Sequence, residues 1–388
     1  MADSARAKRG WTLKSPTGRY RRIDLNEHGQ ESQNFLLSKA ACTLSPFEIA
    51  GMSDAKAYKT FKAIRFHENG GEPFCPRCGV TEVYTMKAKG REHPLYKCAE
   101  CRKPFTVTTC TALAGRKMPI KKILYAIAMF TNGVSGVAAL RLRREIKCSY
   151  KAAFVLSHKL REALGNSREK RLLTGIVEVD GTVLTPKPRK ANMVADRKNF
   201  GVIDEYTDAV GVKAVVIARE RGSGGESRAV VVDVHEARGS SAILKLIDPN
   251  AMIYTDEGNW SGFARNPEYH KVKHKEGLVI EGRHINLVES VNARLKRAAH
   301  GVHYRIRDKN LDLYVNEILW REDYRRLDNG QQWSRIVRAV THQPISKRFK
   351  GYWQRHLQVG TARRRRRSWN GITQVSDVLR ASESSAGA

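Results

Sequence analysis

The sequence predicts an α/β protein, in which a mixed-sheet domain follows a metal-binding ribbon and a helix-turn-helix-like helical domain. Three observations carry this prediction. Two Cys-x-x-Cys pairs lie at 75–78 and 98–101, helical apolar patterns follow between 120 and 164, and alternating apolar stretches then lead to a helix near residue 286. With 388 residues, the chain is long enough for two or three domains, each with its own core.

The charge of the chain is strongly positive. It carries 70 Lys and Arg residues against 39 Asp and Glu, a formal net charge of +31, while 41% of its residues are hydrophobic. This composition indicates a folded protein whose positive field attracts a polyanion, most simply DNA. A basic membrane-surface protein is the alternative, but the sequence contains no apolar run of about 18 residues. No apolar signal core opens the sequence, so a cytoplasmic, nucleoid-associated protein is expected.

Residues 1–60 mix basic and polar residues and predict a basic N-terminal arm. Residues 61–115 then contain two cysteine pairs, which consist of Cys75, Cys78, Cys98 and Cys101. Nineteen residues separate the pairs, a spacing that lets four thiolates surround one Zn²⁺ tetrahedrally in a closed, structural site. Gly79 suits the tight turn, and the stretch between the pairs indicates a β-hairpin. A zinc ribbon is therefore predicted, with two unrelated cysteine pairs or a redox site as the alternative.

Residues 116–167 predict a helical domain with short helices at 120–130, 137–146 and 150–164. Ser149 is placed to cap the third of these helices. Short helices joined by turns with Gly or Ser are typical of a helix-turn-helix, whose third helix would contact DNA through Lys151, Lys159 and Arg161. Periodicity does not show that any helix enters a groove, so a plain three-helix linker stays open.

Residues 172–328 follow a charged linker and predict the α/β domain. Strands are indicated at 174–184, 200–203, 210–218 and 229–234, followed by a helix at 240–247. Asp180 interrupts the first strand, and Asp256 ends a further buried strand at 251–256. Strands and helices in this order predict a mixed sheet.

A further helix is expected to begin near Asn286 and to bury an apolar stripe. Glu289 and Lys296 lie seven residues apart, so they project from one side of this helix. Asn286 and Glu289 also fit a helix capping box, in which the glutamate only accepts backbone N–H groups. Both interpretations stay open from this helix alone.

Three acidic residues, Asp180, Asp256 and Glu289, each have an ordinary structural explanation as a turn former, a strand end or a helix cap. In one strongly basic α/β domain they together suggest an acidic cluster. Carboxylate oxygens are the ligands that hard divalent cations prefer, and two such ions support in-line phosphoryl transfer. The cluster therefore indicates metal-dependent phosphodiester chemistry.

Residues 329–388 predict a basic tail rich in Trp and Arg. The run at 363–367, which includes Arg363, Arg364 and Arg365, consists of five arginines that cannot pack together. These residues are expected to be exposed or to bind phosphates, and a solvated charge run without a partner is the alternative.

From about residue 61 to residue 326, the chain resembles the zinc-ribbon-bearing bacterial insertion-sequence transposases. The likeness runs through Phe74-Cys-Pro-Arg-Cys-Gly79, Tyr96-Lys-Cys-Ala-Glu-Cys101, Val177-Glu-Val-Asp180, Tyr254-Thr-Asp256 and His284-Ile-Asn-Leu-Val-Glu-Ser290. The resemblance implies an RNase H-like catalytic domain whose DDE triad, Asp180, Asp256 and Glu289, binds two catalytic Mg²⁺ ions that Mn²⁺ can replace. It also implies that His284 and Asn286 shape the site, and that Lys296, Arg294 and Arg297 approach DNA phosphate. The stretch Gly181-Thr-Val-Leu184 departs from the family, in which many members have an acidic residue and a glycine-rich hairpin there.

The resemblance further implies a DNA transposase. Its ribbon and helical domain would bind the terminal repeats of an insertion sequence, and its catalytic domain would cut the ends and join them to target DNA. Joining two ends calls for a homodimer or a higher homo-oligomer. Two rival functions stay open: an RNase H-like nuclease or resolvase without strand transfer, and a domesticated zinc-ribbon/helix-turn-helix regulator that has lost its chemistry.

Overall fold

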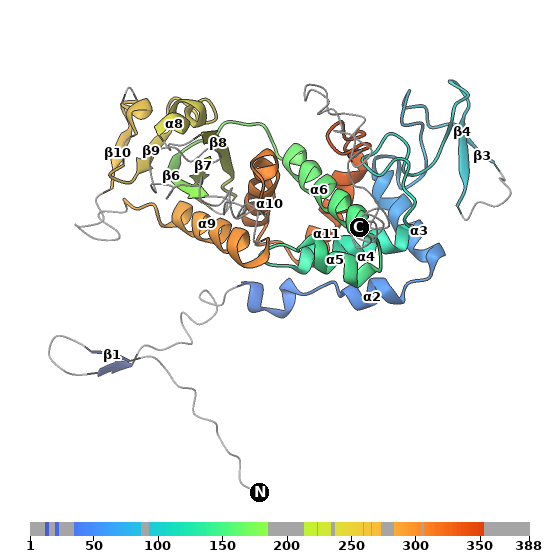
Figure 1. Cartoon of the computed structure of the whole chain (residues 1–388), viewed down its shortest axis with the longest axis horizontal. Coiled ribbons are helices and arrows are strands. Elements are labelled where there is room, and N and C mark those ends of the chain that lie inside the picture. Colours follow the sequence, from blue (N-terminus) through green and yellow to red (C-terminus); the bar gives the residue numbers. More distant parts are fainter. Residues whose placement is uncertain are drawn as a thin grey trace, which may run out of the picture. The chain divides into compact units, whose positions relative to one another are not determined.

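The computed structural model describes residues 12–14, 20–22, 35–86, 93–184 and 213–352, with short gaps at 223, 234–236, 259, 265, 273–282 and 304–305. The chain divides into compact units of residues 1–346 and 347–388, and the helices and strands below belong to the first (Figure 1). A short antiparallel pair, β1 (Thr12–Lys14) and β2 (Tyr20–Arg22), lies within the predicted N-terminal arm. The predicted strand at 200–203 lies outside the described residues.

A mixed sheet forms the centre of the α/β part. Its described strands are β6 (Ile176–Leu184), β7 (Lys213–Glu220), β8 (Ser227–Asp233), β9 (Met252–Thr255) and β10 (Tyr269–Lys271). They lie in the order β10-β9-β6-β7-β8, in which β6, β7 and β8 pair antiparallel while β9 runs parallel to both β6 and β10. Three antiparallel strands followed by parallel additions beside the first are an RNase H-like arrangement, so the predicted fold class is confirmed.

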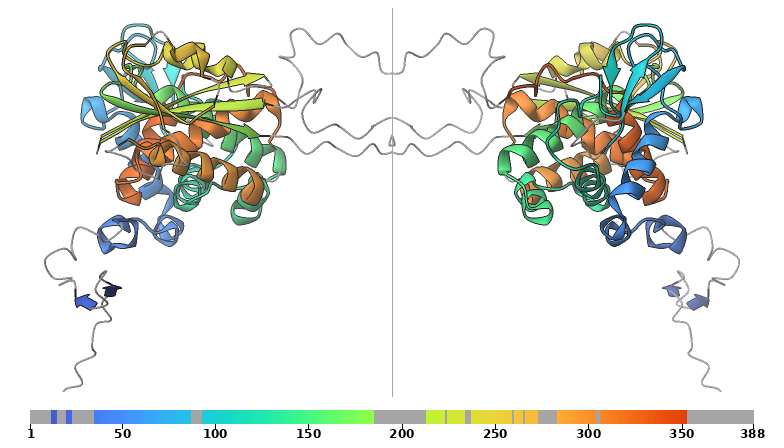
Figure 2. Two further views of the ribbon diagram at one scale, coloured as in Figure 1. Left: turned by 90° about the vertical axis from the view of Figure 1, so that its left-hand side faces the viewer. Right: turned by 90° about the vertical axis from the view of Figure 1, so that its right-hand side faces the viewer.

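Helices cover both faces of this sheet (Figures 1 and 2). Helix α8 (Ala237–Leu244) packs on one face, and helices α9 (Asn286–Arg297) and α10 (Leu311–Asp323) pack on the other. The alternation of β6 follows from this arrangement, because successive side chains of a strand point to opposite faces. Val177 and Val179 are buried in the core beneath α8, whereas Glu178 reaches the beginning of α9. The α9 side of β6 therefore carries the polar residues.

The predicted helices between 120 and 164 are confirmed as α4 (Ile120–Asn132), α5 (Ala139–Ile146) and α6 (Tyr150–Ser167). Ser149 caps α6 as predicted, because its hydroxyl accepts the backbone N–H of Ala152 at 3.2 Å. Apolar residues of α4 and α6 share one core with the ribbon and with the helices next to it. The helical part therefore packs as a folded body.

Two predicted segment boundaries are corrected. Residues 46–60, assigned to the N-terminal arm, contribute α2 (Pro46–Gly51) and most of α3 (Asp54–Arg65), and both helices pack on α4. Residues 329–342, assigned to the basic tail, form α11 (Asn329–His342), which packs on α4 and α6. Trp333 explains the second correction, because its buried indole N–H donates to the Leu124 carbonyl at 3.1 Å. Its apolar surface anchors α11 in the core.

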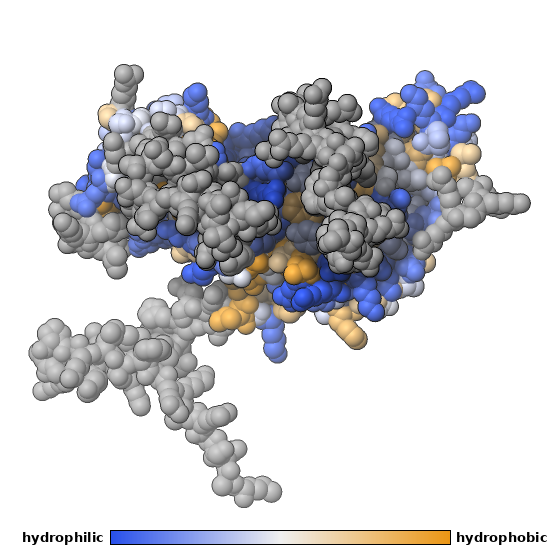
Figure 3. Space-filling model, in the orientation of Figure 1, coloured by the Kyte–Doolittle hydropathy of each residue, from blue (hydrophilic) through white to orange (hydrophobic). Residues whose placement is uncertain are grey.

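The predicted hairpin of the ribbon is confirmed. Strand β3 (Val83–Met86) pairs antiparallel with β4 (Leu95–Cys98), which in turn pairs with β5 (Pro104–Phe105). The described part of the chain contains no helix that is long and apolar enough to cross a membrane. Hydrophilic residues cover much of the described surface visible in Figure 3.

A buried ion cluster connects α6 with α10. The Glu317 carboxylate accepts from Arg161 at 2.6 Å and from Arg321 at 2.9 Å, and all three side chains are at least nine-tenths buried. Burial opposes ionisation of Glu317, but the two guanidinium groups lower its pKa to about 2. The carboxylate therefore stays charged and holds the two helices together.

His303 next to this cluster predicts a loss of stability in acid. Burial, and then the charge of Arg161, lower the pKa of His303 to about 4, whereas an unfolded histidine titrates near 6.5. Between these two pKa values, His303 is protonated in the unfolded chain but neutral in the folded chain. The free energy of unfolding therefore falls as the pH decreases from about 6.5 to about 4. The loss is of order 3 kcal/mol. Urea unfolding at pH 7 and pH 4.5 measures it, and His303→Gln should reduce the difference; an unchanged difference would refute this assignment.

Candidate functional site

Two aspartates come together because the strands that carry them are neighbours. Strands β6 and β9 run parallel, with Glu178 paired to Tyr254. Two residues further along, the chain reaches Asp180 on β6 and Asp256 just after β9. Residues two apart on a strand share a face, so both aspartates lie on the α9 side of the sheet. Glu289 belongs to the first turn of α9, which packs against β6.

Asp180 responds electrostatically to the other two carboxylates. Burial raises the pKa of Asp180, and the charges of Asp256 and Glu289 raise it further. Hydrogen bonds from the Asn292 amide and the Gly181 N–H, both at 2.8 Å, act in the opposite direction. A buried carboxylate with two other acidic groups nearby is suited to bind a cation. Asp180 is thus close enough to the predicted residues Asp256 and Glu289 for their charges to act on it.

Asn292 is a residue that sequence reasoning missed. It lies three residues after Glu289, so the two share a face of α9. Its amide donates to Asp180 Oδ2 at 2.8 Å and is almost fully buried. This bond ties the helix that carries one carboxylate to the strand that carries another. Its position three residues after Glu289 could have indicated that Asn292 faces the same site.

Asp256 is held by its own loop. Its Oδ1 atom accepts the backbone N–H of Gly258 at 3.1 Å and the indole N–H of Trp260. Trp260 is buried in the core beneath α8. The Asp256 carboxylate, which lies on the α9 side of the sheet, is therefore held in place by a residue that is anchored on the α8 side.

Glu178, and not the predicted capping box, holds the beginning of α9. The residue that caps α9 is Ile285, and no side chain of the cap residue accepts a hydrogen bond. Instead, Oε2 of the fully buried Glu178 accepts the N–H groups of Leu287 at 2.8 Å and Val288 at 3.2 Å. A negative charge at a helix N-terminus interacts favourably with the helix dipole. The capping function that was open for Glu289 is thus carried by a strand residue.

The second oxygen of Glu178 fixes the segment before α9. Glu178 Oε1 accepts from Arg221 Nε at 2.7 Å and lies 3.2 Å from Nδ1 of His284. Arg221 also donates to the His284 carbonyl at 2.6 Å. His284 therefore contacts a positioning residue, while Asn286 is the exposed first residue of α9.

Glu178→Gln is expected to lower both stability and the rate of DNA cleavage. The amide keeps the shape but leaves the largely buried Arg221 charge without its partner, which costs about 3 kcal/mol. Small displacements of the Glu289 helix should slow cleavage by about 10²-fold. Urea unfolding and a cleavage assay on end DNA measure the two effects. The exposed Glu268→Gln serves as the control, and a Glu178→Gln protein as stable and active as this control would contradict the role of Glu178.

The four cysteines of the ribbon form a compact ligand set. Their Sγ atoms all lie within 4.8 Å of one another, with Cys75 and Cys101 at 3.6 Å and Cys78 and Cys98 at 3.5 Å. Sulfurs that surround Zn²⁺ tetrahedrally at about 2.3 Å are about 3.8 Å apart. Gly79 makes the tight turn with a positive φ of 81°, and its N–H donates to the Cys75 carbonyl at 2.9 Å.

The chemistry of these thiols also fits a metal. Burial raises the pKa of Cys75 to about 11, so a nearby cation is needed to keep this sulfur a thiolate at neutral pH. All four tetrahedral positions are filled by protein sulfur. The cluster therefore fits a structural Zn²⁺ site, as the spacing of the pairs predicts.

Two family models match the chain. One, described as an ISXO2-like transposase domain, matches residues 172–323, and the other, a transposase zinc-ribbon domain, matches residues 52–104. Together they cover more than half of the chain. The chain belongs to the zinc-ribbon-bearing insertion-sequence transposases. No curated protein and no solved structure matches it.

The matched segments contain the groups described above. The transposase domain spans Asp180, Asp256 and Glu289 together with Glu178 and Asn292, and the zinc-ribbon domain spans the four cysteines. The zinc-ribbon match begins at residue 52, which places α3 with the ribbon instead of with the N-terminal arm.

Several cations that were predicted to contact DNA are placed differently in this transposase. Arg161 is 1% exposed and belongs to the buried cluster around Glu317, so it cannot meet a phosphate. Lys159 is partly buried and donates to the Ala112 carbonyl at 2.7 Å. The physical reason is that α10 and α11 both pack on α6 and cover its second half. Lys151, in the first turn of α6, is exposed.

The cations of α9 divide into two groups. Arg294 forms an ion pair with the buried carboxylate of Glu322, whereas Lys296 and Arg297 are exposed at the end of the helix. The predicted contacts at Arg363, Arg364 and Arg365 lie outside the described residues. A structural role for Arg294 is thus observed, and Lys296 and Arg297 keep the exposure that a phosphate contact needs.

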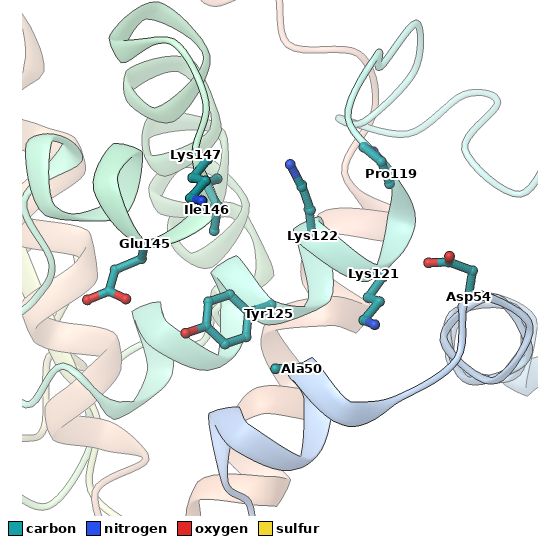
Figure 4. A pocket seen from close by; sticks show the side chains of 9 residues that line it. All are labelled: Ala50, Asp54, Pro119, Lys121, Lys122, Tyr125, Glu145, Ile146 and Lys147. Atoms are coloured by element: carbon teal, nitrogen blue, oxygen red, sulfur yellow. The ribbon is translucent and has the colours of Figure 1, made fainter.

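A basic cavity of about 540 Å³ lies beside the helical part of the transposase (Figure 4). Its positive side chains are Lys121 and Lys122 of α4 and Lys147, which follows α5. Glu145 and Asp54 also line it and offset part of this charge. The neighbouring α5 exposes Arg141, Arg143 and Arg144. Cations thus gather around α5 and the beginning of α6.

Proposed function

We propose that the protein is a DNA transposase that binds the terminal repeats of its element, cleaves the element's ends and joins them to target DNA. The single observation that carries the proposal is the convergence of Asp180, Asp256 and Glu289 from two adjacent parallel strands and one helix. Membership of a transposase family and a net charge of +31 support it.

The carboxylate oxygens of the three acidic residues are the kind of ligand that hard divalent cations prefer. Asp180, Asp256 and Glu289 would hold Mg²⁺, or Mn²⁺ in its place. When bound, the ions activate an attacking oxygen and stabilise the leaving oxygen of a phosphodiester.

The side chains around the triad position it. Asn292 and Glu178 join α9 to β6, so that Glu289 and Asp180 keep a fixed separation. Trp260 and Gly258 orient the Asp256 carboxylate from the opposite side. Cleavage and joining can therefore use one preorganised site, since the same acidic groups serve first a water and then the 3′-hydroxyl of the cut end.

DNA binding is proposed for the exposed cations of α9 and of the helical part. Lys296 and Arg297 lie two turns beyond Glu289, while Lys151 and the α5 arginines lie on the helical part. Because each phosphate contact releases counterions, such residues act on affinity in a salt-dependent way.

Lys296→Ala is expected to weaken binding to end DNA. Loss of one phosphate contact should lower the slope of log K against log salt by about 0.9. Lys245→Ala, an exposed lysine of the same domain on the α8 side of the sheet, is the matched control and should leave the slope unchanged. Fluorescence anisotropy at several salt concentrations measures both. Equal slopes for the two variants and the wild type would exclude Lys296 from the DNA interface.

Labelled end DNA incubated with the full-length protein, Mg²⁺ and a target plasmid tests the proposed function. A transposase yields cut ends and then label covalently joined to the plasmid. Cut ends without joined product would indicate a nuclease or resolvase, and bound but uncut DNA would indicate a regulator. The size of the complex on end DNA tests whether a homodimer or higher oligomer assembles, which the joining of two ends requires.

A further inference from the structure

A second cluster of metal-binding side chains lies apart from the cysteines and from the three carboxylates. His67 and Glu68 belong to η3 (His67–Asn69), which follows α3, and His342 is the last residue of α11. One ligand atom of each residue lies within 4.8 Å of the ligand atoms of the other two. We propose that these three side chains form a second zinc site, which joins η3, just before the first cysteine pair of the ribbon, to α11.

The spacing of the donors fits this ion. Nitrogen and oxygen ligands at about 2.0–2.2 Å around a tetrahedral Zn²⁺ are about 3.3 Å apart. Nε2 of His342 lies 3.5 Å from Oε1 of Glu68. The rings of His67 and His342 meet edge to face, with centroids 5.5 Å apart and an angle of 67° between their planes. Small side-chain movements therefore suffice to bring three donors around one ion.

His342 is held in the form that binds metal. Its Nδ1 lies 2.8 Å from the Arg338 carbonyl oxygen, one helical turn earlier. A carbonyl oxygen only accepts, so Nδ1 carries the hydrogen and Nε2 keeps its lone pair beside Glu68. A histidine that binds a metal almost always donates its other ring N–H to such a partner, which fixes the tautomer and the ring.

His67 contributes one ring nitrogen to the cluster. Its Nδ1 atom is buried, and the backbone of Ile64 lies close enough to interact with the ring. The Arg338 guanidinium lies close enough to His67 for its charge to act on the ring. The Arg338 charge opposes a divalent cation, and the Glu68 carboxylate offsets it.

The ligand set selects the metal. Two imidazoles and one carboxylate are typical ligands of Zn²⁺, and the fourth position is left for water. Residues 68 and 342 lie 274 positions apart in the sequence, so the ion would link distant parts of the chain. The rival interpretation is an ordinary surface ion pair between Glu68 and His342, which needs no metal.

Equilibrium dialysis of the full-length protein against micromolar Zn²⁺, with excess Mg²⁺ to compete at the acidic cluster, tests the proposal. His67→Gln and His342→Gln should each bind one equivalent less zinc than the wild type. His300→Gln, an exposed histidine of η6 (Ala298–Val302), should bind as much as the wild type. Unchanged zinc content in His67→Gln and His342→Gln would overturn the proposal.

Co²⁺ substitution provides a check on folding in the same samples. The intense thiolate-to-metal absorption of the cysteine site should persist in both histidine variants, which shows that the ribbon is intact. The weaker visible bands of a nitrogen and oxygen site should disappear in these variants and remain in His300→Gln. Loss of the thiolate absorption together with the second equivalent would also overturn the proposal, because the effect would then be one of folding.

Discussion

Asp180→Asn is expected to abolish DNA cleavage while DNA binding persists. The amide keeps the size of the side chain and its place next to Asn292. It removes the negative charge of Asp180, whose pKa is raised by burial and by the two other carboxylates. Losing a metal ligand of this kind should remove about 4 kcal/mol of transition-state stabilisation, which corresponds to a rate about 10³-fold lower. Cleavage of labelled end DNA measures the rate, and anisotropy with the same DNA measures binding.

Glu268→Gln is the matched control for this substitution. Glu268 is an exposed carboxylate just before β10 in the same domain, so its variant changes the net charge by the same amount. It should cleave at the wild-type rate. If Asp180→Asn cleaved as fast as Glu268→Gln, the acidic cluster would have no role in the chemistry. Asp256→Asn and Glu289→Gln should be as inactive as Asp180→Asn.

Cys98→Ser is expected to remove one equivalent of zinc and to unfold the ribbon. Cys98 is fully buried, and its loss breaks a closed four-sulfur site. Zinc contributes roughly 10–16 kcal/mol to the folding of small zinc-finger peptides, so a ribbon without its metal should not stay folded. Tyr96 and Phe105 of the ribbon share a core with the helical part, and the helical part should therefore also lose stability.

Zinc content, thermal unfolding and limited proteolysis measure these effects. Cleavage sites should appear within residues 61–115 before they appear elsewhere. Cys42→Ser removes an exposed thiol outside the ribbon and should behave as the wild type. A Cys98→Ser protein with full zinc content and an unchanged melting temperature would show that these cysteines do not bind the metal.

The parts of the fold that local pattern controls could be predicted from the sequence. The cysteine spacing predicted the ribbon, and helical periodicity predicted α4, α5 and α6 close to their bounds. An acidic cluster of Asp180, Asp256 and Glu289 could be suggested because all three lie in one strongly basic α/β domain. Their assignment as a metal-binding triad depended on the family resemblance, since strand order is not visible in a local pattern.

The parts that depend on distant packing could not be predicted. Glu178 looks like an ordinary strand residue, because the N–H groups that it accepts belong to a helix 109 residues later. Arg161 lies on a helix with exposed cations at its beginning, and only the packing of α10 shows that it is buried. Helix α11 was assigned to the tail because its sequence is basic and rich in Trp, although Trp333 packs in the core.

Asp180 is proposed to hold a divalent cation during DNA cleavage, and a change of metal preference tests this role most directly. Asp180→Cys replaces a hard oxygen ligand by a sulfur, which binds Mg²⁺ poorly and tolerates the softer Mn²⁺ better. We expect Asp180→Cys to be inactive with Mg²⁺ and to regain cleavage with Mn²⁺, while Asp180→Ala stays inactive with both. Cleavage by Asp180→Cys at the wild-type rate in Mg²⁺ would contradict the claim.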